Sequence, residues 1–151
     1  MNILSIDHGL KRIGLAIGNS DRKIATPISH INNMSEIFVI DQIKSIVKDY
    51  EIEEIIIGIP LDEDGNESLQ SDKVRKFAYL LKKNVNLNLF GIDERFSSVD
   101  SEKMLIDADL SRKKRKKNID SLSASIILQR YFDGNEIILL CIKINIRKKL
   151  E

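Results

Sequence analysis

The chain has 151 residues, of which 42% are hydrophobic and 31% are charged, and its formal net charge is +1 at pH 7. This balance is typical of one globular domain, excludes a largely disordered chain, and argues against a protein that coats nucleic acid through its overall charge. A single cysteine and two histidines exclude a disulfide framework within the chain and a cysteine-based zinc site.

The N-terminal residues enter a strand pattern directly, without the basic segment that opens a signal peptide. The longest apolar stretches are far shorter than the ~20 residues that are needed to span a bilayer. We therefore expect no association with membranes and a location in the reducing cytoplasm.

Three strands are predicted at the start of the chain. Residues 2–7 form an apolar run that ends at Asp7, and residues 12–18 alternate isoleucine or leucine with glycine or alanine. The link between the two runs is short, so they are predicted to pair as an antiparallel hairpin. Residues 24–31 are predicted to form a third strand, which Pro27 places at the edge of the sheet or divides.

The rest of the core is predicted to alternate helices with strands. Ile37, Ile40 and Ile43 recur at helical spacing, and residues 55–59 are apolar on both faces, which is typical of a parallel strand covered by helices. The predicted elements are a helix at 35–50, a strand at 55–59, a helix at 68–84, a strand at 87–93, and helices at 98–109 and 119–132. This order predicts an α/β fold whose mixed five-stranded sheet, with its first three strands antiparallel, is flanked by helices.

The C-terminal residues 136–151 are predicted to form a tail outside a single domain of residues 1–135. Residues 137–142 are apolar and the residues after them are basic. This pattern leaves three alternatives open, which are an added strand, a packed helix and a segment that binds a partner.

Carboxylates follow two of the predicted buried strands. Asp7 ends the first strand, and Asp93 and Glu94 end the strand at 87–93. Carboxylates that meet without neutralisation repel each other, and Mg²⁺ or Mn²⁺ is the usual remedy because both ions prefer oxygen ligands. Neighbouring residues in a strand point to opposite faces, so only one of the second pair can face Asp7. We favour Glu94 as the ligand and Asp93 as a structural residue that pairs with Arg95 or caps a helix.

Asp120 is the third candidate acid. It lies in the first turn of the last predicted helix, where an aspartate also suits the helix dipole without any further role. However, Asp120 shares one helical face with Ala124, Ile127 and Tyr131. That apolar stripe is predicted to face the sheet, and an acid that points inward needs a partner such as a cation shared with Asp7.

Basic residues are concentrated just before Asp120, in a run that is predicted to separate the last two helices. The run comprises Arg112, Lys113, Lys114, Arg115, Lys116 and Lys117. Such a run contacts phosphates or is simply a solvated loop, and both alternatives stay open. Two other patterns are set aside: residues 62–66 lack the acid and the glycine position of a calcium loop, and a lone histidine such as His8 is usually solvated.

Four strings of residues occur in order along the chain. They are Asp7-His8-Gly9-Leu10-Lys11-Arg12-Ile13-Gly14, Gly58-Ile59-Pro60-Leu61 with Gly65, Asp93-Glu94-Arg95-Phe96-Ser97-Ser98, and Ser111-Arg112-Lys113-Lys114-Arg115-Lys116 followed by Asp120. Together they resemble the YqgF family of Holliday-junction-resolvase-like proteins and pre-16S rRNA nucleases, over residues 1 to about 133. The pattern departs from the family at Leu10, where threonine is usual, and at Ser98, where threonine is common.

The resemblance implies a ribonuclease-H-like fold and a metal-dependent nuclease. It implies that Asp7, Glu94 and Asp120 are the catalytic residues and the ligands of Mg²⁺ or Mn²⁺. Related junction resolvases carry a fourth acid close after the third, which this chain lacks, so the number of metals stays open. The basic run, with Lys11, Arg12 and Arg95, is expected to bind nucleic acid through its backbone.

The expected function is hydrolysis of phosphodiester bonds during 5′-end processing of precursor 16S rRNA in ribosome biogenesis. The expected partners are precursor rRNA or branched DNA and the precursor of the small ribosomal subunit, and a homodimer is left open. One alternative is a Holliday-junction or branched-DNA endonuclease. Another is a non-catalytic nucleic-acid-binding module of the same fold.

Overall fold

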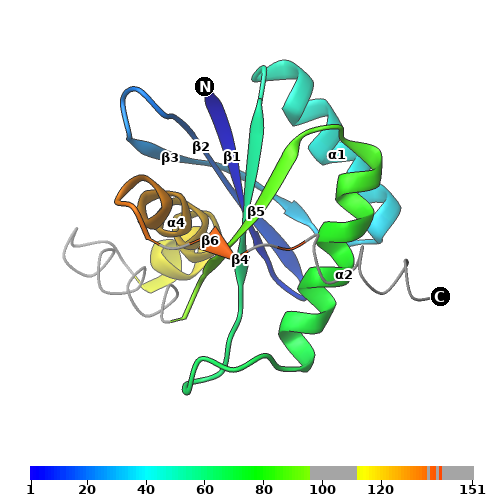
Figure 1. The fold of residues 1–151 in the computed structure, drawn as a ribbon, viewed down its shortest axis with the longest axis vertical. Helices are drawn as coiled ribbons and strands as arrows, with labels where there is room; N and C mark the ends of the chain where they lie inside the picture. Colours follow the sequence, from blue (N-terminus) through cyan, green and yellow to red (C-terminus); the bar gives the residue numbers. More distant parts are fainter. Residues whose placement is uncertain (96–111, 136, 139, 141–151) are drawn as a thin grey trace.

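The computed structural model describes residues 1–95, 112–135, 137, 138 and 140, and it describes side chains for all of these except residues 112–120. The elements in chain order are β1 (Asn2–His8), β2 (Arg12–Asn19), β3 (Ala25–Asn32), α1 (Glu36–Asp49), β4 (Glu54–Ile59), α2 (Leu69–Asn84), β5 (Asn88–Asp93), α4 (Arg112–Phe132) and β6 (Ile137–Ile138) (Figure 1). The predicted helix at 98–109 lies outside the described residues.

The strands form one mixed sheet in the order β3-β2-β1-β4-β5-β6. β1, β2 and β3 are antiparallel, as predicted, whereas β1, β4 and β5 are parallel to one another. β3 lies at the edge, which suits Pro27 because proline cannot donate a backbone hydrogen bond. The α/β prediction is therefore confirmed in its main features.

The predicted strand count of five is wrong, because the described sheet has six strands. Ile137 and Ile138 pair antiparallel with Ile92 and Gly91 of β5, and Leu140 beyond them is buried. Burial of Leu140 and partial burial of Ile138 explain why the start of the tail joins the sheet, whereas Ile137 is exposed. Of the three alternatives for the tail, the added strand is the one that residues 137–138 adopt.

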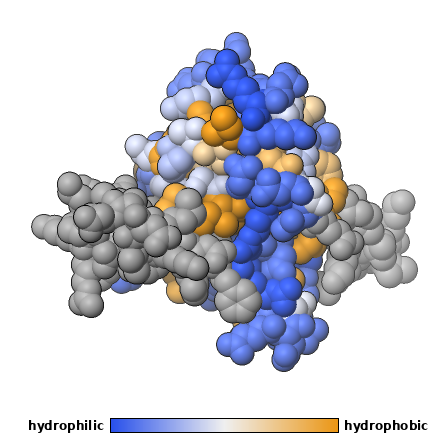
Figure 2. All heavy atoms as spheres, turned by 90° about the vertical axis from the view of Figure 1, so that its left-hand side faces the viewer, coloured by the Kyte–Doolittle hydropathy of each residue, from blue (hydrophilic) through white to orange (hydrophobic). Residues whose placement is uncertain are grey.

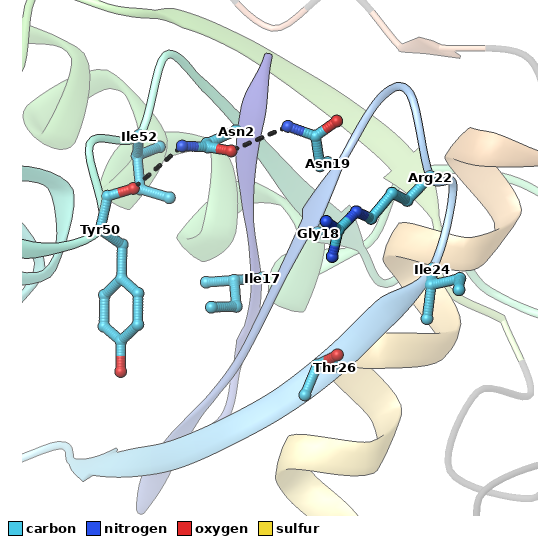
Figure 3. Close-up of a pocket in the computed structure, with 9 residues that line it drawn as sticks. All are labelled: Asn2, Ile17, Gly18, Asn19, Arg22, Ile24, Thr26, Tyr50 and Ile52. Carbon is cyan, nitrogen blue, oxygen red and sulfur yellow. Dashed lines mark hydrogen bonds between the residues drawn. The ribbon is translucent and has the colours of Figure 1, made fainter.

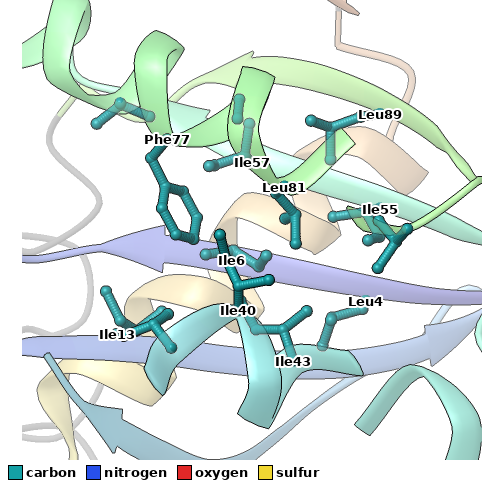
Figure 4. Close-up of a cluster of buried hydrophobic side chains, with 14 of the residues drawn as sticks. Leu4, Ile6, Ile13, Ile40, Ile43, Ile55, Ile57, Phe77, Leu81 and Leu89 are labelled. Carbon is teal, nitrogen blue, oxygen red and sulfur yellow. The ribbon is translucent and has the colours of Figure 1, made fainter. Parts of the chain in front are cut away.

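The helices cover both faces of the sheet (Figure 1). Every residue of β4 is buried, as the apolar run of residues 55–59 predicted. On one face Leu4, Ile6 and Ile13 pack with α1 and α2 through side chains such as Phe77 (Figure 4). On the other face, the packed side chains come from β1, β4, β5 and α4, and they are Ile3, Ile56, Ile92, Ile127 and Leu128.

Capping residues fix where α1 and α2 begin. The Ser35 hydroxyl accepts a hydrogen bond from the Phe38 amide at 3.1 Å, and Ser68 and Ser71 form a capping box before α2. One predicted core position in α1 is wrong. Ile37 is 76% exposed, whereas Val39 is buried beside the predicted Ile40 and Ile43, so the core face of α1 includes Val39 in place of Ile37.

The predicted break before the last helix is also wrong. α4 begins at Arg112, so the basic residues 112–117 belong to the helix and are not a link between two helices. Lysine and arginine are good helix formers, and neither glycine nor proline interrupts the sequence from 112 to 132. The helix therefore extends from its packed half along the basic run.

Apolar side chains are mostly inside the molecule. On the face that Figure 2 shows, hydrophilic side chains predominate over the described part and apolar ones gather in small patches. This distribution is typical of a globular domain with one core on each side of a sheet. Among the described helices, none combines the length and the apolar character that a crossing of a bilayer requires.

Candidate active site

Asp7 and Glu94 come together where the parallel strands β1 and β5 reach their C-terminal ends. Asp7 is the next-to-last residue of β1, Glu94 directly follows β5, and both strands run parallel to β4 between them. Because side chains alternate along a strand, Asp7 is on the same face as Ile3 and Glu94 is on the same face as Ile92, which is the face that α4 covers. Ligand roles for the two acids remain predictions, but the predicted meeting of the two strand ends is confirmed.

The two carboxyl groups interact strongly. Burial, then the charge of Asp7 and a hydrogen bond with Asp7, raise the pKa of Glu94 to about 9. The Oε2 atom of Glu94 is buried, and it has no hydrogen-bond partner among the residues that the structure describes. In the absence of a cation, Glu94 therefore holds a proton at neutral pH while Asp7 lies beside it.

Gly58 in β4 is what allows the two acids to meet. A Cβ atom at this position would collide with Oε2 of Glu94, and it would lie 2.6 Å from Cδ1 of Ile127 and 3.0 Å from Cβ of Glu94. The Glu94 side chain therefore crosses β4 over the bare backbone of Gly58 to reach Asp7. The available signal was one glycine within an otherwise apolar, fully buried strand, a position that often marks a close approach.

Asp93 has a structural role in the described part of the chain. Nε of Arg95 donates to its Oδ2 at 2.8 Å, and the amide of Arg95 donates to its Oδ1 at 3.0 Å. Burial tends to raise the pKa of the Asp93 carboxyl, but the hydrogen bonds and the charge of Arg95 outweigh burial and bring the pKa below its usual value. The Arg95 guanidinium also donates to the Glu63 carbonyl at 3.3 Å. Arg95 thus joins the end of β5 to the loop after β4, and its predicted contact with nucleic acid is untested.

Arg130 is a residue at the site that sequence reasoning missed. Its Nη1 donates to the Asp93 carbonyl at 2.9 Å, so α4 holds the end of β5 from the side opposite to Arg95. The positive charge of Arg130 also opposes the rise in the pKa of Glu94. Nothing in the local pattern distinguished Arg130 from the other basic residues of the helix.

Asp120 lies in α4, and its side chain is outside the described set. The helical face on which it was predicted to lie does face the sheet, since Ala124 and Ile127 are fully buried. The Ser5 hydroxyl donates to the Ala124 carbonyl at 2.6 Å, and the Tyr131 hydroxyl donates to Glu54 at 2.7 Å. These contacts fix the rotation of the helix about its axis, whereas the role of Asp120 stays a prediction.

The structure also describes the surroundings of Gly9 and His8 near Asp7, and of Asp62 in the loop after β4. The space beside Gly9 is taken by the Arg12 carbonyl, which accepts a hydrogen bond from the Gly9 amide at 3.0 Å and closes the hairpin turn. His8 is not simply solvated, because its half-buried ring lies 4.4 Å from that of Phe77. In the rejected calcium loop, Asp62 accepts the amides of Asp64 and Asn66 and so shapes the loop.

The residues present fit a divalent cation. Among the described side chains, no three of His, Cys, Asp and Glu gather closely enough to hold a metal. Asp7 and Glu94 nevertheless supply hard oxygen donors, and the buried Oε2 of Glu94 lacks a described partner. A third carboxylate would have to come from outside the described side chains, as Asp120 would.

The stability of the metal-free chain is expected to fall as the pH rises. The pKa of Glu94 is about 9 in the folded chain against its ordinary 4.5, so between these values the folded state holds a proton that the unfolded state has lost. The stabilisation is complete below pH 4.5 and is lost as the pH rises through 9, with a slope of up to about 1.4 kcal/mol per pH unit.

Urea unfolding in EDTA across this pH range measures the slope. The Glu94→Gln variant is the control, because glutamine carries no titrating proton, and its slope should be clearly smaller. An equal slope in both chains would show that Glu94 is not the group responsible.

Comparisons with known proteins identify the fold and the family. The family model described as "RuvX: Holliday junction resolvase" matches residues 1–134. A protein of Maridesulfovibrio salexigens described as "Putative pre-16S rRNA nuclease" is 39% identical over 87% of this chain and 97% of its own length, and one of Halothermothrix orenii with the same description is 40% identical over 88% and 95%.

Two solved structures are similar to this chain. RuvC of T. thermophilus in complex with a Holliday junction substrate has a TM-score of 0.55 at 9% identity, covering 87% of this chain and 93% of that one. The Fowlpox virus resolvase with Holliday junction DNA has a TM-score of 0.56 at 16% identity, covering 89% and 98%. At these identities the likeness shows the fold alone, which is the predicted ribonuclease-H-like fold.

Proposed function

The chain belongs to the RuvX family of Holliday junction resolvases, and from this membership we propose that it is a metal-dependent nuclease that processes the 5′ end of precursor 16S rRNA. The observation that carries the proposal is the meeting of Asp7 and Glu94 across Gly58. A partly buried glutamate whose pKa is raised by a neighbouring aspartate, at the end of parallel strands, is suited to a cation and poorly suited to any structural purpose.

The proposed cation site consists of Asp7 and Glu94 with Asp120. Mg²⁺ or Mn²⁺ bound at such carboxylates supplies Lewis-acid stabilisation of the negative charge that develops during in-line displacement at a phosphodiester. Asp7 and Glu94 orient the site from two different strands, and Gly58 leaves the room that this needs. Arg130 and Arg95 hold the backbone and side chain of Asp93, and thereby fix the position of Glu94.

The proposed contacts to nucleic acid are electrostatic. The basic residues 112–117 lie in the N-terminal part of α4, and residues 123–128 of the same helix include the ones that pack on the sheet. Together with Lys11 and Arg12 at the hairpin beside Asp7, the basic residues suit a phosphate backbone without reading bases. The partners that follow are precursor rRNA and the small-subunit precursor, in the cytoplasm.

RNA is preferred over branched DNA because the curated relatives at 39% and 40% identity are named for pre-16S rRNA. Branched DNA remains the second candidate, because the structurally similar T. thermophilus and Fowlpox virus proteins are seen with Holliday junctions. A non-catalytic module is the third candidate.

Cleavage of two labelled substrates tests the proposal. The full chain is incubated with precursor 16S rRNA and, separately, with a four-way DNA junction, in Mg²⁺ or Mn²⁺ and again with excess chelator. We expect cleavage of the RNA near its 5′ end that the chelator abolishes. Cleavage of the DNA junction while the RNA stays uncleaved would favour the branched-DNA endonuclease. Binding without cleavage of either substrate would favour the non-catalytic module.

A further inference from the structure

A pocket of about 340 Å³ lies at the end of β1 opposite to Asp7. It is formed where the turn between β2 and β3 faces the C-terminal end of α1 (Figure 3). Its volume lies within the range of pockets that hold small organic ligands. None of the residues of the acidic pair lines it, so it is separate from the candidate active site.

The pocket is largely apolar with one cation. Ile17 and Ile52 contribute apolar surface, the ring of Tyr50 forms one side, and Arg22 extends across the other side (Figure 3). Tyr50 is 45% exposed and Ile24 is 65% exposed, so the pocket is open to ligands. An aromatic wall that faces a cation across apolar surface suits a flat apolar body that carries a negative charge.

The polar groups at the closed end are already engaged. Nδ2 of Asn19 donates to Oδ1 of Asn2 at 3.0 Å, and Nδ2 of Asn2 donates to the Tyr50 carbonyl at 3.3 Å. These bonds hold the strand ends and the end of α1 in place and so pre-form the pocket. By contrast, within the described part of the chain, no hydrogen bond or ion pair engages the Arg22 guanidinium.

We propose that this pocket binds one unpaired purine nucleotide, with its base against Tyr50 and the isoleucine surface and its phosphate on Arg22. Stacking on an aromatic side chain is tolerant of sequence, and arginine is well suited to phosphate. The choice of a nucleotide over other aromatic anions rests on the proposed function, because a nuclease works among single-stranded segments and their products. The pocket itself does not depend on that function.

Two sources can supply this nucleotide, a free mononucleotide and an unpaired nucleotide of an RNA strand. The strand β1 separates the pocket from Asp7 by five residues, or roughly 17 Å at strand spacing. A substrate strand can therefore occupy both places only if it continues several nucleotides beyond the cleaved bond. The same chemistry applies to both sources, and the experiment separates them.

Amide NMR spectra of the full chain test the proposal with matched probes. AMP, adenosine, ribose 5-phosphate and a short oligoadenylate are titrated separately without divalent cation. We expect AMP to shift the amides of residues 17–26 and 50–52 saturably, adenosine to bind about tenfold more weakly, and ribose 5-phosphate not to saturate. Tighter binding of the oligoadenylate than of AMP identifies RNA as the source, and equal binding identifies the free nucleotide.

Variants decide whether the named side chains are responsible. Arg22→Ala and Tyr50→Ala should each weaken AMP about tenfold. Tyr50→Phe keeps the ring and Lys23→Ala removes the neighbouring cation that does not line the pocket, so both should bind AMP as the natural chain does. Equal losses in Arg22→Ala and Lys23→Ala, or shifts confined to the Asp7 end, would overturn the proposal. If the chain binds AMP in this pocket but cleaves no RNA, the proposed nucleotide site is supported and the proposed nuclease function is rejected.

Discussion

Asp7→Asn is expected to abolish most metal-dependent cleavage while binding of RNA is retained. Asparagine keeps the shape of the side chain but removes the charge that neighbours Glu94, so the pair loses its attraction for a cation. Loss of a group that stabilises developing charge costs about 10²–10³-fold in rate. Single-turnover cleavage of labelled precursor rRNA, with filter binding of the same RNA, measures both quantities.

The same variant is not expected to lose stability. Asp7 raises the pKa of Glu94 by charge and by a hydrogen bond, so its neutralisation relieves a repulsion in the metal-free chain at alkaline pH. Asp21→Asn is the matched control, because Asp21 is an exposed acid in the turn at the other end of β2, and it should cleave normally. Full cleavage by Asp7→Asn would assign the activity to another site or to a contaminant.

Gly58→Ala is expected to reduce cleavage about as strongly and to lower the stability as well. The added Cβ occupies the space of the Glu94 side chain and meets Cδ1 of Ile127 at 2.6 Å, so Glu94 must leave Asp7 or α4 must shift. Overpacking of this kind destabilises by about 1–3 kcal/mol. Chemical denaturation and cleavage, both at a temperature where the variant is folded, separate the two effects.

Gly91→Ala is the matched control for this change. Its Cβ would meet Cγ1 of Ile59 at 2.8 Å and Cδ2 of Leu140 at 3.1 Å, on the face of the sheet that lies away from Asp7. We expect a comparable loss of stability with cleavage retained. If Gly91→Ala lost as much cleavage as Gly58→Ala, the effect would be one of stability, and the role given to Gly58 would be wrong.

The sequence predicted the core of the fold because hydrophobic patterns determine it. The alternation in residues 12–18 and the doubly apolar run 55–59 leave little choice of face or neighbour. The helix start at Arg112 and the strand at Ile137 and Ile138 were missed for a common reason. Both depend on what the segments contact in three dimensions, and local propensity alone does not distinguish them from a basic link and a free tail.

The candidate site was predictable in part. Strand alternation indicated that only one of Asp93 and Glu94 could neighbour Asp7. Glu94 was favoured, and the structure places Glu94 beside Asp7. Gly58 and Arg130 were not predicted as parts of the site, because their roles arise from contacts across strands and between helix and sheet. No pattern along the chain reports that a glutamate crosses a neighbouring strand.

Binding of Mn²⁺ to the full chain, in the absence of nucleic acid, tests the central claim most directly. Calorimetry at neutral pH in two buffers of different ionisation enthalpy reports both the affinity and the protons released. If Asp7 and Glu94 hold the cation, the natural chain releases about one proton per ion as Glu94 ionises, and Glu94→Gln and Asp7→Asn both lose binding. Unchanged Mn²⁺ affinity in these two variants would contradict the claim.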